Sequence, residues 1–583
     1  MKKALFIFLI LSLAAEILIF NFRFFLPARD VRAPHKQAAA SAQIVQAQEF
    51  IFDNGALLLK SEPPVRPSFH FNFLRLLLLF LFMSSVYFLR KPKLRDMRID
   101  TRSYRQKMAF KWVVILSCAF YFLLFITTTS GRLLREMDDN NYSALADAFL
   151  SGQTYFKNAP PAELSLLPNP YDRAARMGMK KIVRWDTAYY NGKYYSYFGA
   201  LPAVVLFAPV KFLTGRHLAL PAARLLILFA LAPAFLFLYR RIVFNYFKDS
   251  NFVLFITGAA LIGAGGPLLY AMTRNHDQYT VPIISGLLFT ALALGRMLDF
   301  HLKKENKCRN LFLAGLCFAA VLWCRPNMGI YIFCAAPFLL HAFKENLKNK
   351  KMLLHYALCF VAPVVLLVIP LMAYNYVRFS SPFDFGAAYN LTVADVRTYS
   401  FTQFWKLPPG LLAYLSQPPS LSFRFPFLHF SELSVNLPGF FHMEAVFGFI
   451  FFPIIFGLFF IRDMFKRLRD KVFTRFIFTM LVCAGALVIF DIFMGGVAVR
   501  YFMDFEPFLL LVALLAWLSA EAGARDKNTR AGLYYAALIC AAITFIVRFA
   551  LILNGESTNL FDGIRFHSPW IYIFLERTFE FWT

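Results

Sequence analysis

The sequence predicts an all-α integral membrane protein. Three features support this fold class: the composition, the length of the apolar blocks and the placement of the basic residues. Of the 583 residues, 59% are hydrophobic and 72 are phenylalanine. The apolar residues fall in long blocks rather than amphipathic stripes, and many blocks approach the ~20 residues that a helix needs to cross a bilayer. The segments between them are too short to form an independent soluble domain.

About thirteen transmembrane helices are expected, with roughly eleven as the lower bound. The predicted segments are 4–21, 73–89, 112–129, 219–239, 252–270, 278–298, 311–324, 327–343, 353–376, 443–461, 474–494, 505–521 and 531–553. The pair 311–324 and 327–343 is short for two spans, so a re-entrant hairpin or a tilted pair is the alternative there.

The basic residues indicate the orientation of these helices. They give a formal net charge of +27 and cluster in alternate short loops. The clusters are Arg90 to Lys111, Arg240 to Lys248, Arg296 to Arg309, Lys344 to Lys351, Arg462 to Arg475 and Arg525 to Arg530. The positive-inside rule places these loops and the N-terminus in the cytoplasm and the C-terminus outside. Anionic lipid head groups are their natural partners, and nucleic acid is unnecessary. The expected location is the plasma (inner) membrane of a bacterium.

The N-terminus resembles a secretory signal, because Met1-Lys-Lys precedes an apolar run. No A-x-A-like site closes that run at Phe20–Phe25, so an uncleaved anchor is expected. The expected organisation is an anchor over 1–25, a linker, second span and basic loop over 26–108, a transmembrane catalytic domain over 109–553, and an extracytoplasmic tail over 554–583. Seven cysteines lie in apolar segments and Cys308 lies in a basic loop. Without metal-site spacing or a pairing framework, they are interpreted as small apolar fillers.

Two large loops, 130–218 and 377–442, face outward in this topology. The first contains the adjacent carboxylates Asp138 and Asp139. Ionisable groups next to a span usually mark a function, although ordinary solvated loop residues are the alternative. Adjacent side chains point in different directions, so at most one faces a bound substrate. We expect Asp138 to be that one, with Asp139 capping the helix that follows.

Both loops are expected to bear juxtamembrane helices. Apolar spacing from Tyr142 to Phe149 predicts a helix along the interface that stops at Gly152. Residues 200–213 are too short and proline-broken for a span, and they predict another outer helix. Between them, the stretch from Trp185 to Tyr197 is dense in aromatics around an Asn-Gly turn. It is interpreted either as an interfacial aromatic belt or as a surface that stacks on a sugar.

Further polar residues map to the outer ends of the predicted spans. They are Arg274, His276, Asp277, Arg325, Arg378, Asp491, Arg500 and Asp504. Each alone is compatible with a snorkelling arginine or a helix-capping aspartate. Together they place both signs of charge on one face at one depth. A phosphorylated, lipid-linked substrate requires this, because arginines hold phosphate and a carboxylate handles the acceptor proton.

These residues resemble the GT-C superfamily, polytopic glycosyltransferases that use polyprenyl- or dolichyl-phosphate sugars. The superfamily includes the aminoarabinose and protein O-mannosyl transferases. The motifs are Asp138-Asp-Asn-Asn-Tyr142 through Gly152, Tyr197 to Pro209 with Gly215, His276-Asp277, Asn375 to Gly386, and Arg500-Tyr-Phe-Met-Asp504 to Pro507. The resemblance covers roughly residues 110–520. It departs where many relatives have Asp-Glu in the first loop, and Arg325 replaces a lysine found in many of them.

The resemblance implies a sugar transferase on the outer face. Asp138 or Asp139 would be the general base for an acceptor hydroxyl, which attacks the anomeric carbon with inversion. Arg325, Arg378 and Arg500 would bind the donor phosphate. Asp277, beside His276, would orient the acceptor or coordinate a cation. The remaining substrate-binding candidates are Asp186, Lys193, Tyr194 and Asp504.

The implied donor is a polyprenyl-phosphate-linked hexose or pentose. The acceptor would be a cell-envelope glycan, a lipid or a protein. No cofactor is assigned. Some relatives need a divalent cation and others do not, and two adjacent aspartates display too few oxygen ligands to decide.

Other function classes remain as alternatives. A transporter or flippase would be expected to show internal repeats and binding residues at mid-membrane, and the sequence shows no repeat. A polysaccharide polymerase would share the outer-face site. A nucleotide-sugar enzyme is disfavoured, since no Gly-rich phosphate loop opens a helix after a strand. The Asn-x-Ser/Thr sequences at Asn141 and Asn390 are treated as chance matches.

Overall fold

The computed structural model separates the chain into two compact units, which are described individually. Unit 1 comprises Met1–Lys91, Phe423–Phe425 and Ile573–Thr583, and unit 2 comprises Pro92–Ser422 and Pro426–Tyr572. The described residues are 2–18, 50–53, 56–59, 72–129, 131–136, 140–179, 183–272, 278–422, 425, 427–431, 437, 439, 441–444, 446–553, 564 and 568–579.

Unit 1 contains a pair of apolar helices, α1 (Lys2–Leu18) and α2 (Phe73–Leu89), and a short hairpin of β1 (Phe50–Asp53) with β2 (Ala56–Leu59). The helices run antiparallel, because the rings of Phe8 and Tyr87 pack at 5.6 Å while Arg75 Nε donates to Glu16 Oε2 at 2.6 Å. Each helix has 17 residues, roughly 26 Å at 1.5 Å per residue. Both predicted helices are therefore present, but each is short for a full span.

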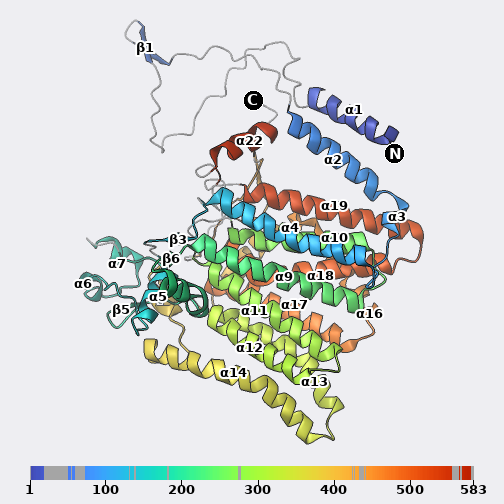
Figure 1. The fold of residues 1–583 in the computed structure, drawn as a ribbon. Helices are drawn as coiled ribbons and strands as arrows, with labels where there is room; N and C mark the ends of the chain where they lie inside the picture. The colour runs from blue at the N-terminus through green and yellow to red at the C-terminus, as the bar shows by residue number, and fades with distance from the viewer. Residues whose placement is uncertain are drawn as a thin grey trace. The chain divides into compact units, whose positions relative to one another are not determined.

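Unit 2 is a bundle of long apolar helices (Figure 1). Ten helices of the described chain are long and apolar enough to span a membrane. They are α4 (Tyr104–Thr128), α9 (Leu220–Tyr246), α10 with η3 and η4 (Phe252–Met272), α11 (Thr280–Leu302), α12 (Lys307–Cys324), η5 with α13 (Pro326–Glu345), α14 (Lys350–Phe379), α17 (Lys471–Met494), η11 with α18 (Val499–Ala522) and α19 (Lys527–Ile552). The all-α prediction is confirmed, and residues 311–343 fall in two helices that are each long and apolar enough for a span.

The count of thirteen is not confirmed, and the predicted helix over 443–461 is wrong in its form. Residues 442–444 are drawn into backbone pairing, with Glu444 N donating to Val497 O at 2.9 Å. The helical segment starts at η9 (Phe449–Phe451), and Pro453 then begins the 3₁₀ helix η10 (Pro453–Phe460), followed by α16 (Ile461–Arg467). This chain still runs beside α18, because the Phe449 and Phe505 rings lie 5.8 Å apart and Arg467 reaches the Gly523 carbonyl at 3.0 Å.

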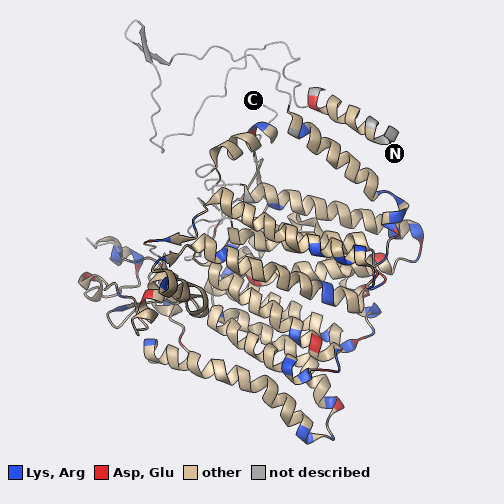
Figure 2. Ribbon diagram, in the orientation of Figure 1, with Lys and Arg blue, Asp and Glu red and all other residues tan. Residues whose placement is uncertain are grey.

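Charge is unevenly placed along unit 2. Lys and Arg gather at the end of the bundle that carries α3 (Pro92–Arg95) and α16 (Figure 2). The opposite end carries the two outer loops, with α5 (Asn141–Leu150), α6 (Ala162–Ser165) and α7 (Arg173–Met177) drawn beyond the helix ends (Figure 1). The alternation of basic and long loops predicted from the sequence is therefore present in unit 2.

The first outer loop follows its predicted local structure. Helix α5 ends at Leu150, and Gly152 adopts a φ of 71° just after it. Strands β4 (Ala188–Tyr190) and β5 (Lys193–Tyr195) form a hairpin across the Asn-Gly turn, and η2 with α8 gives the outer helix Ala203–Thr214. Between α4 and α9, β3 (Leu134–Arg135) pairs with β6 (His217–Leu218).

The N-cap of α5 differs from the prediction. The cap is Asn140, whose side chain accepts from the backbone N–H groups of Tyr142 and Ser143, both at 2.9 Å. Asn140 is the N-cap because its extended backbone directs the side-chain amide oxygen toward the free N–H groups of the first helical turn. The assignment of Asp139 as the cap was therefore wrong. Asp138 and Asp139 themselves lie outside the described residues.

The second outer loop is closed by short elements. They are η6 (Ala387–Tyr389), η7 (Val396–Thr398), η8 (Phe404–Lys406), α15 (Leu407–Ser416), β7 (Ser420–Leu421) and β8 (Leu428–His429). Backbone hydrogen bonds join this loop to the first outer loop. Asp186 N donates to Leu391 O at 2.9 Å, and Leu391 N donates to Thr187 O at 3.0 Å. The two outer loops thus form one structure at this end of the bundle.

A labelling experiment tests the sidedness of unit 2. Asn158 is exposed in the first outer loop and Lys348 is exposed in a basic loop. Asn158→Cys should react with a membrane-impermeant maleimide in intact cells, and Lys348→Cys should react only after permeabilisation, because basic loops stay inside. The unsubstituted chain provides the background of native thiols. The reversed pattern would place the outer loops in the cytoplasm.

Candidate functional site

A cavity of about 360 Å³ lies where the two outer loops meet the ends of α17 and α18. Its walls come from five parts of the chain, and they combine charged, amide and aromatic side chains. The lining residues are Trp185, Asp186, Tyr197, Tyr279, Ala387, Asn390, Thr392, Val393, Val396, Tyr399, His442, Glu444, Met494, Gly495, Arg500 and Tyr501. Its volume falls within the range of small-molecule sites.

Asp186 is held in the cavity wall by its backbone. Its φ is 50°, in the left-handed region that few residues other than glycine adopt. Besides the bond to Leu391, its carbonyl accepts from Asn141 Nδ2 at 2.6 Å. The residue is 5% exposed. The loop therefore fixes one carboxylate at the cavity rather than leaving it in solvent.

Burial raises the pKa of the Asp186 carboxyl. Hydrogen bonds from Thr392 and Asn390, and the positive charge of Arg500, oppose that rise without cancelling it. Asn390 Nδ2 lies 3.4 Å from Asp186 Oδ1. A carboxylate with a raised pKa is a stronger proton acceptor than one in water, which suits a general base.

Positive charge is brought to the same cavity by Arg500. Its guanidinium lies over two rings, with its carbon 4.7 Å from the centre of Tyr279 and 5.1 Å from the centre of Tyr501. It forms an ion pair with Glu444. His442 Nε2 lies 3.6 Å from Glu444 Oε1 on the same wall.

The position of His442 and Glu444 depends on a close approach of two backbones. Val497 N donates to the His442 carbonyl at 2.9 Å. Gly496 has a φ of 83°, and a Cβ there would lie only 2.2 Å from that carbonyl oxygen. Only glycine satisfies both conditions. The Gly495-Gly496 pair thus lets the 442–444 segment lie against the start of α18.

A second ion pair lies behind the cavity wall. Arg325 Nε and Nη2 contact the two oxygens of Asp504 at 3.1 and 2.5 Å, and the Asp504 side chain is 0% exposed. The Arg325 guanidinium carbon is 5.5 Å from the centre of the Tyr501 ring. Beside this pair, Asn327 Nδ2 donates to Asp491 Oδ1 at 3.3 Å. Tyr501 is therefore a shared neighbour of the Arg325 and Arg500 guanidinium groups.

Arg378 is not brought to the cavity. It is 4% exposed, and its guanidinium donates to the Ser196 carbonyl and to Asn375 Oδ1, both at 2.6 Å. Its carbon also lies 3.8 Å from the centre of the Tyr374 ring. These contacts occupy the side chain in joining α14 to the first outer loop. The geometry therefore disfavours the predicted phosphate contact for Arg378.

The remaining sequence candidates divide into two groups. Lys193 is exposed over the Tyr155 ring at 4.0 Å, and Tyr194 packs against Tyr189 with ring centres 6.2 Å apart, so neither lines the cavity. His276 and Asp277, like the Asp138-Asp139 pair, lie outside the described residues. Their predicted roles stay predictions.

Several cavity residues were not found from the sequence. His442 and Glu444 carry no motif, because their place comes from pairing with Val497. Asn390 and Thr392 belong to an Asn-x-Thr sequence that is interpreted above as a chance match. Both residues line the cavity. The best available signal was this cluster of amide and hydroxyl groups beyond Arg378.

A buried lysine supports the same wall. Lys406 is 1% exposed, donates to the Phe493 carbonyl at 3.4 Å and lies 4.1 Å from the centre of the Tyr399 ring. Burial lowers its pKa. It therefore fixes Tyr399 and the end of α17 while adding positive potential behind the lining.

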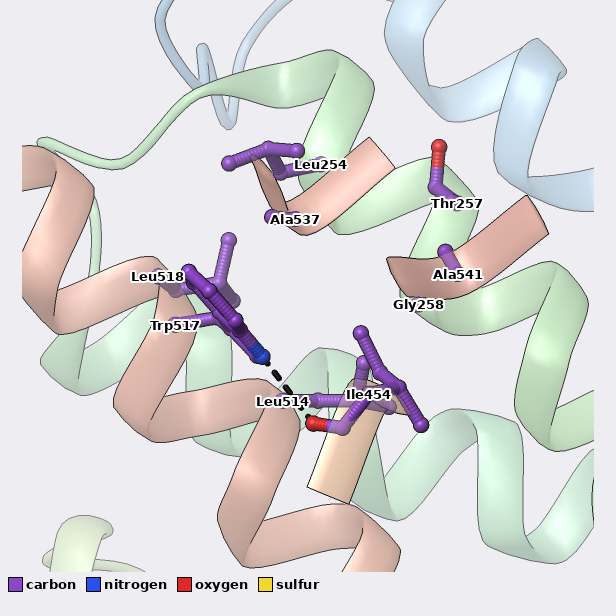
Figure 3. Close-up of a pocket in the computed structure, with 9 residues that line it drawn as sticks. All are labelled: Leu254, Thr257, Gly258, Ile454, Leu514, Trp517, Leu518, Ala537 and Ala541. Carbon is purple, nitrogen blue, oxygen red and sulfur yellow. Dashed lines mark hydrogen bonds between the residues drawn. The ribbon is translucent and has the colours of Figure 1, made fainter. Parts of the chain in front are cut away.

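A much smaller cavity lies among the helices (Figure 3). Its volume is about 10 Å³, room for at most one water molecule. Apolar side chains such as Leu254 and Leu514 dominate its lining, and Trp517 Nε1 donates to the Ile454 carbonyl at 2.9 Å beside it. It is a packing gap and offers no chemistry.

Metal binding at the large cavity gains no support from the described residues. Within that part of the chain, no three or more His, Cys, Asp or Glu side chains converge on the cavity closely enough to hold an ion. Asp186 and Glu444 are its two described carboxylates. The predicted divalent cation therefore stays a prediction.

Two solved structures resemble this chain at low similarity. The crystal structure of ArnT from Cupriavidus metallidurans bound to undecaprenyl phosphate has 12% identity, a TM-score of 0.38, and coverage of 79% of this chain and 78% of that one. The archaeal oligosaccharyltransferase AglB from Archaeoglobus fulgidus, in complex with an inhibitory peptide and a dolichol-phosphate, has 13% identity, a TM-score of 0.42, and coverage of 77% and 56%. No family model and no curated protein matches the sequence. Likenesses at this level assign neither a family nor an activity.

The ion pair behind the cavity gives a stability prediction. Arg325→Met should lower the free energy of unfolding in detergent by about 3–5 kcal/mol, because Asp504 would keep an uncompensated buried charge. The double variant Arg325→Met, Asp504→Leu should recover part of that loss. Arg397→Met is the matched control, since its pair with Asp395 has a 43% exposed arginine and should contribute at most about 1 kcal/mol. Equal losses at Arg325 and Arg397 would contradict this.

Proposed function

We propose that this protein is a membrane glycosyltransferase that moves a sugar from a polyprenyl-phosphate donor to an acceptor hydroxyl on the outer-loop side. The acceptor class is a cell-envelope glycan, lipid or protein. One observation carries the proposal: a cavity at the outer-loop end of the bundle holds a buried carboxylate of raised pKa and an arginine on its lining. The resemblance of the outer-loop motifs to GT-C glycosyltransferases supports the same reaction.

The reaction follows from these groups. Asp186 accepts the proton of the acceptor hydroxyl. The hydroxyl oxygen forms a bond to the anomeric carbon of the sugar. The bond from that carbon to the phosphate oxygen breaks, and the electron pair leaves with the polyprenyl phosphate. Arg500 offsets the negative charge that grows on the leaving phosphate. Attack opposite the leaving group inverts the anomeric centre.

The remaining lining suits a sugar between these charges. Trp185, Tyr197, Tyr399 and Tyr501 provide ring faces, while Asn390 provides an amide group for sugar hydroxyls. Aromatic faces and a few placed polar groups are typical of small-molecule sites. Because the cavity lies at the bundle end, a lipid tail could remain in the bilayer while the sugar phosphate enters it.

Mass spectrometry of lipid-linked and surface glycans tests this function. Cells that lack the protein should lose one sugar from an envelope glycan, lipid or protein and accumulate its polyprenyl-phosphate form. Reintroducing the chain should reverse both changes. Loss of the lipid-linked form itself from the outer leaflet, without loss of transfer in membranes supplied with donor, would support a flippase instead.

Asp186→Asn should reduce transfer by about 10²–10⁴-fold while the protein stays folded and inserted, because an amide cannot accept the proton. Asp172→Asn is the matched control: it is exposed in the same loop, lies off the cavity and caps α7, a role that Asn also fills. Asp138→Asn and Asp139→Asn are measured in parallel. Wild-type transfer by Asp186→Asn with loss in either of these would move the base to the first-loop pair.

The pH dependence gives an independent check on Asp186. The base acts in its deprotonated form, so kcat/KM should fall as pH drops through the raised pKa of this carboxyl. Thr392→Val removes a hydrogen bond that lowers this pKa. The acid limb of the profile should therefore move to higher pH in that variant. A limb that stays in place, or moves to lower pH, would exclude Asp186 as the titrating base.

A further inference from the structure

Three metal-ligating side chains meet away from the cavity, at the end of unit 2 where the basic loops lie. They are Cys308 near the start of α12, and His355 and Cys359 near the start of α14. Their ligand atoms all lie within 4.8 Å of one another. Cys359 Sγ is 4.0 Å from His355 Nε2.

The packing of two helices creates this cluster. His355 and Cys359 are four residues apart on α14, so they share one face of that helix. The α12 and α14 backbones approach closely, because a Cβ on Gly315 would lie 2.3 Å from the Phe360 carbonyl oxygen. That approach directs Cys308 toward the same face. Sequence spacing alone could not reveal the cluster, since the ligands come from two helices.

The ligand set selects the ion. Two thiolates and one imidazole suit soft or borderline d¹⁰ cations, whereas Mg²⁺ and Ca²⁺ prefer oxygen. Metal–sulfur bonds of ~2.3 Å and metal–nitrogen bonds of ~2.0 Å bring ligand atoms within about 4 Å of one another, close to the arrangement already present.

We propose that Cys308, His355 and Cys359 form a binding site for a thiophilic d¹⁰ metal ion, Zn²⁺ or Cu⁺. The three ligands complete a trigonal Cu⁺ site, and with one water molecule they complete a tetrahedral Zn²⁺ site. His355 is exposed on the surface of α14, whereas Cys308 and Cys359 are partly buried. The proposal does not depend on the proposed glycosyl transfer.

Such an ion would tie α14 to the bundle. Only 17% of the apolar window of α14 is buried, and α12 is the main helix against which α14 packs. A metal bridge from α12 to α14 near their starts would supplement those contacts. Metal binding should therefore raise the thermal midpoint of the protein as well as load the site.

The test uses the full-length protein purified in detergent under reducing conditions. Zn²⁺ binding is measured by elemental analysis after dialysis, Cu⁺ binding by anaerobic competition with a chromophoric chelator, and thiolate ligation by the charge-transfer band of Co²⁺. About one equivalent of one of these ions is expected, with a raised thermal midpoint. Cys308→Ser, His355→Ala and Cys359→Ser should each weaken binding and abolish the stabilisation.

Cys540→Ser and His341→Ala are the matched controls, since both residues are partly exposed and lie outside the cluster. Both should bind like the unsubstituted chain. Binding below about a tenth of an equivalent, or binding that Cys308→Ser leaves unchanged, would overturn the proposal. A Cys308–Cys359 disulfide in protein isolated with thiols trapped in the cell would overturn it as well.

Discussion

The site depends on keeping opposite charges paired at the end of an apolar bundle. An isolated charge in this environment is unfavourable by several kcal/mol, so each arginine needs a partner to stay there. Arg325 has Asp504, Arg500 has Glu444, and both guanidinium groups lie near the Tyr501 ring. Breaking either pair would change the charge of the whole wall.

In the proposed reaction, these pairs favour Arg500 over Arg325 as the contact for the donor phosphate. Arg325 contacts both oxygens of a carboxylate that is 0% exposed, and this bidentate pair uses the planar fork of the guanidinium. Arg500 lines the cavity directly and shares its wall with His442 and Glu444. A phosphate entering the cavity would contact Arg500 before Arg325, because Arg500 is the one of the two that lines the cavity. Arg325 and Asp504 would then act by holding Tyr501 in place.

Preorganisation of Asp186 depends on the joining of the two outer loops. A left-handed backbone is unfavourable by roughly 1–2 kcal/mol for a residue with a side chain. Bonds to Leu391 and Asn141 offset that strain. The strained turn places the carboxylate next to Asn390 and Thr392 of the other loop, so the base of the proposed reaction is already oriented.

The fold could be predicted from the sequence because apolar length and loop charge are local properties. Ten predicted spans recur as long apolar helices, and the Asn-Gly hairpin and the helix ending before Gly152 recur too. The failures involve long-range contacts. The helix expected from 443 starts at Phe449, because residues 442–444 pair with Val497 instead.

The candidate site could be predicted only in part, because local sequence does not show long-range contacts. Arg500 and Asp186 line the cavity, as expected of substrate-binding residues on the outer side. Arg378 was expected beside them because it opens the second loop. The Arg378 guanidinium instead lies over the ring of Tyr374 and donates to the carbonyl of Ser196. His442 and Glu444 had no sequence signal, since a backbone contact far along the chain positions them.

The placement of irregular backbone favours an outer-face enzyme over a transporter. Transporters are expected to break their helices near the membrane midplane, around a central binding site. In the described part of unit 2, the π and 3₁₀ segments 261–272 and 326–335 lie at the ends of their candidate spans that are farther from the basic loops in sequence. The carboxylate pairing deeper in the bundle, between Glu506 and Arg548, is internal and fully buried. The groups assigned to the proposed reaction therefore come from the loops at this end of the bundle and not from the helix centres.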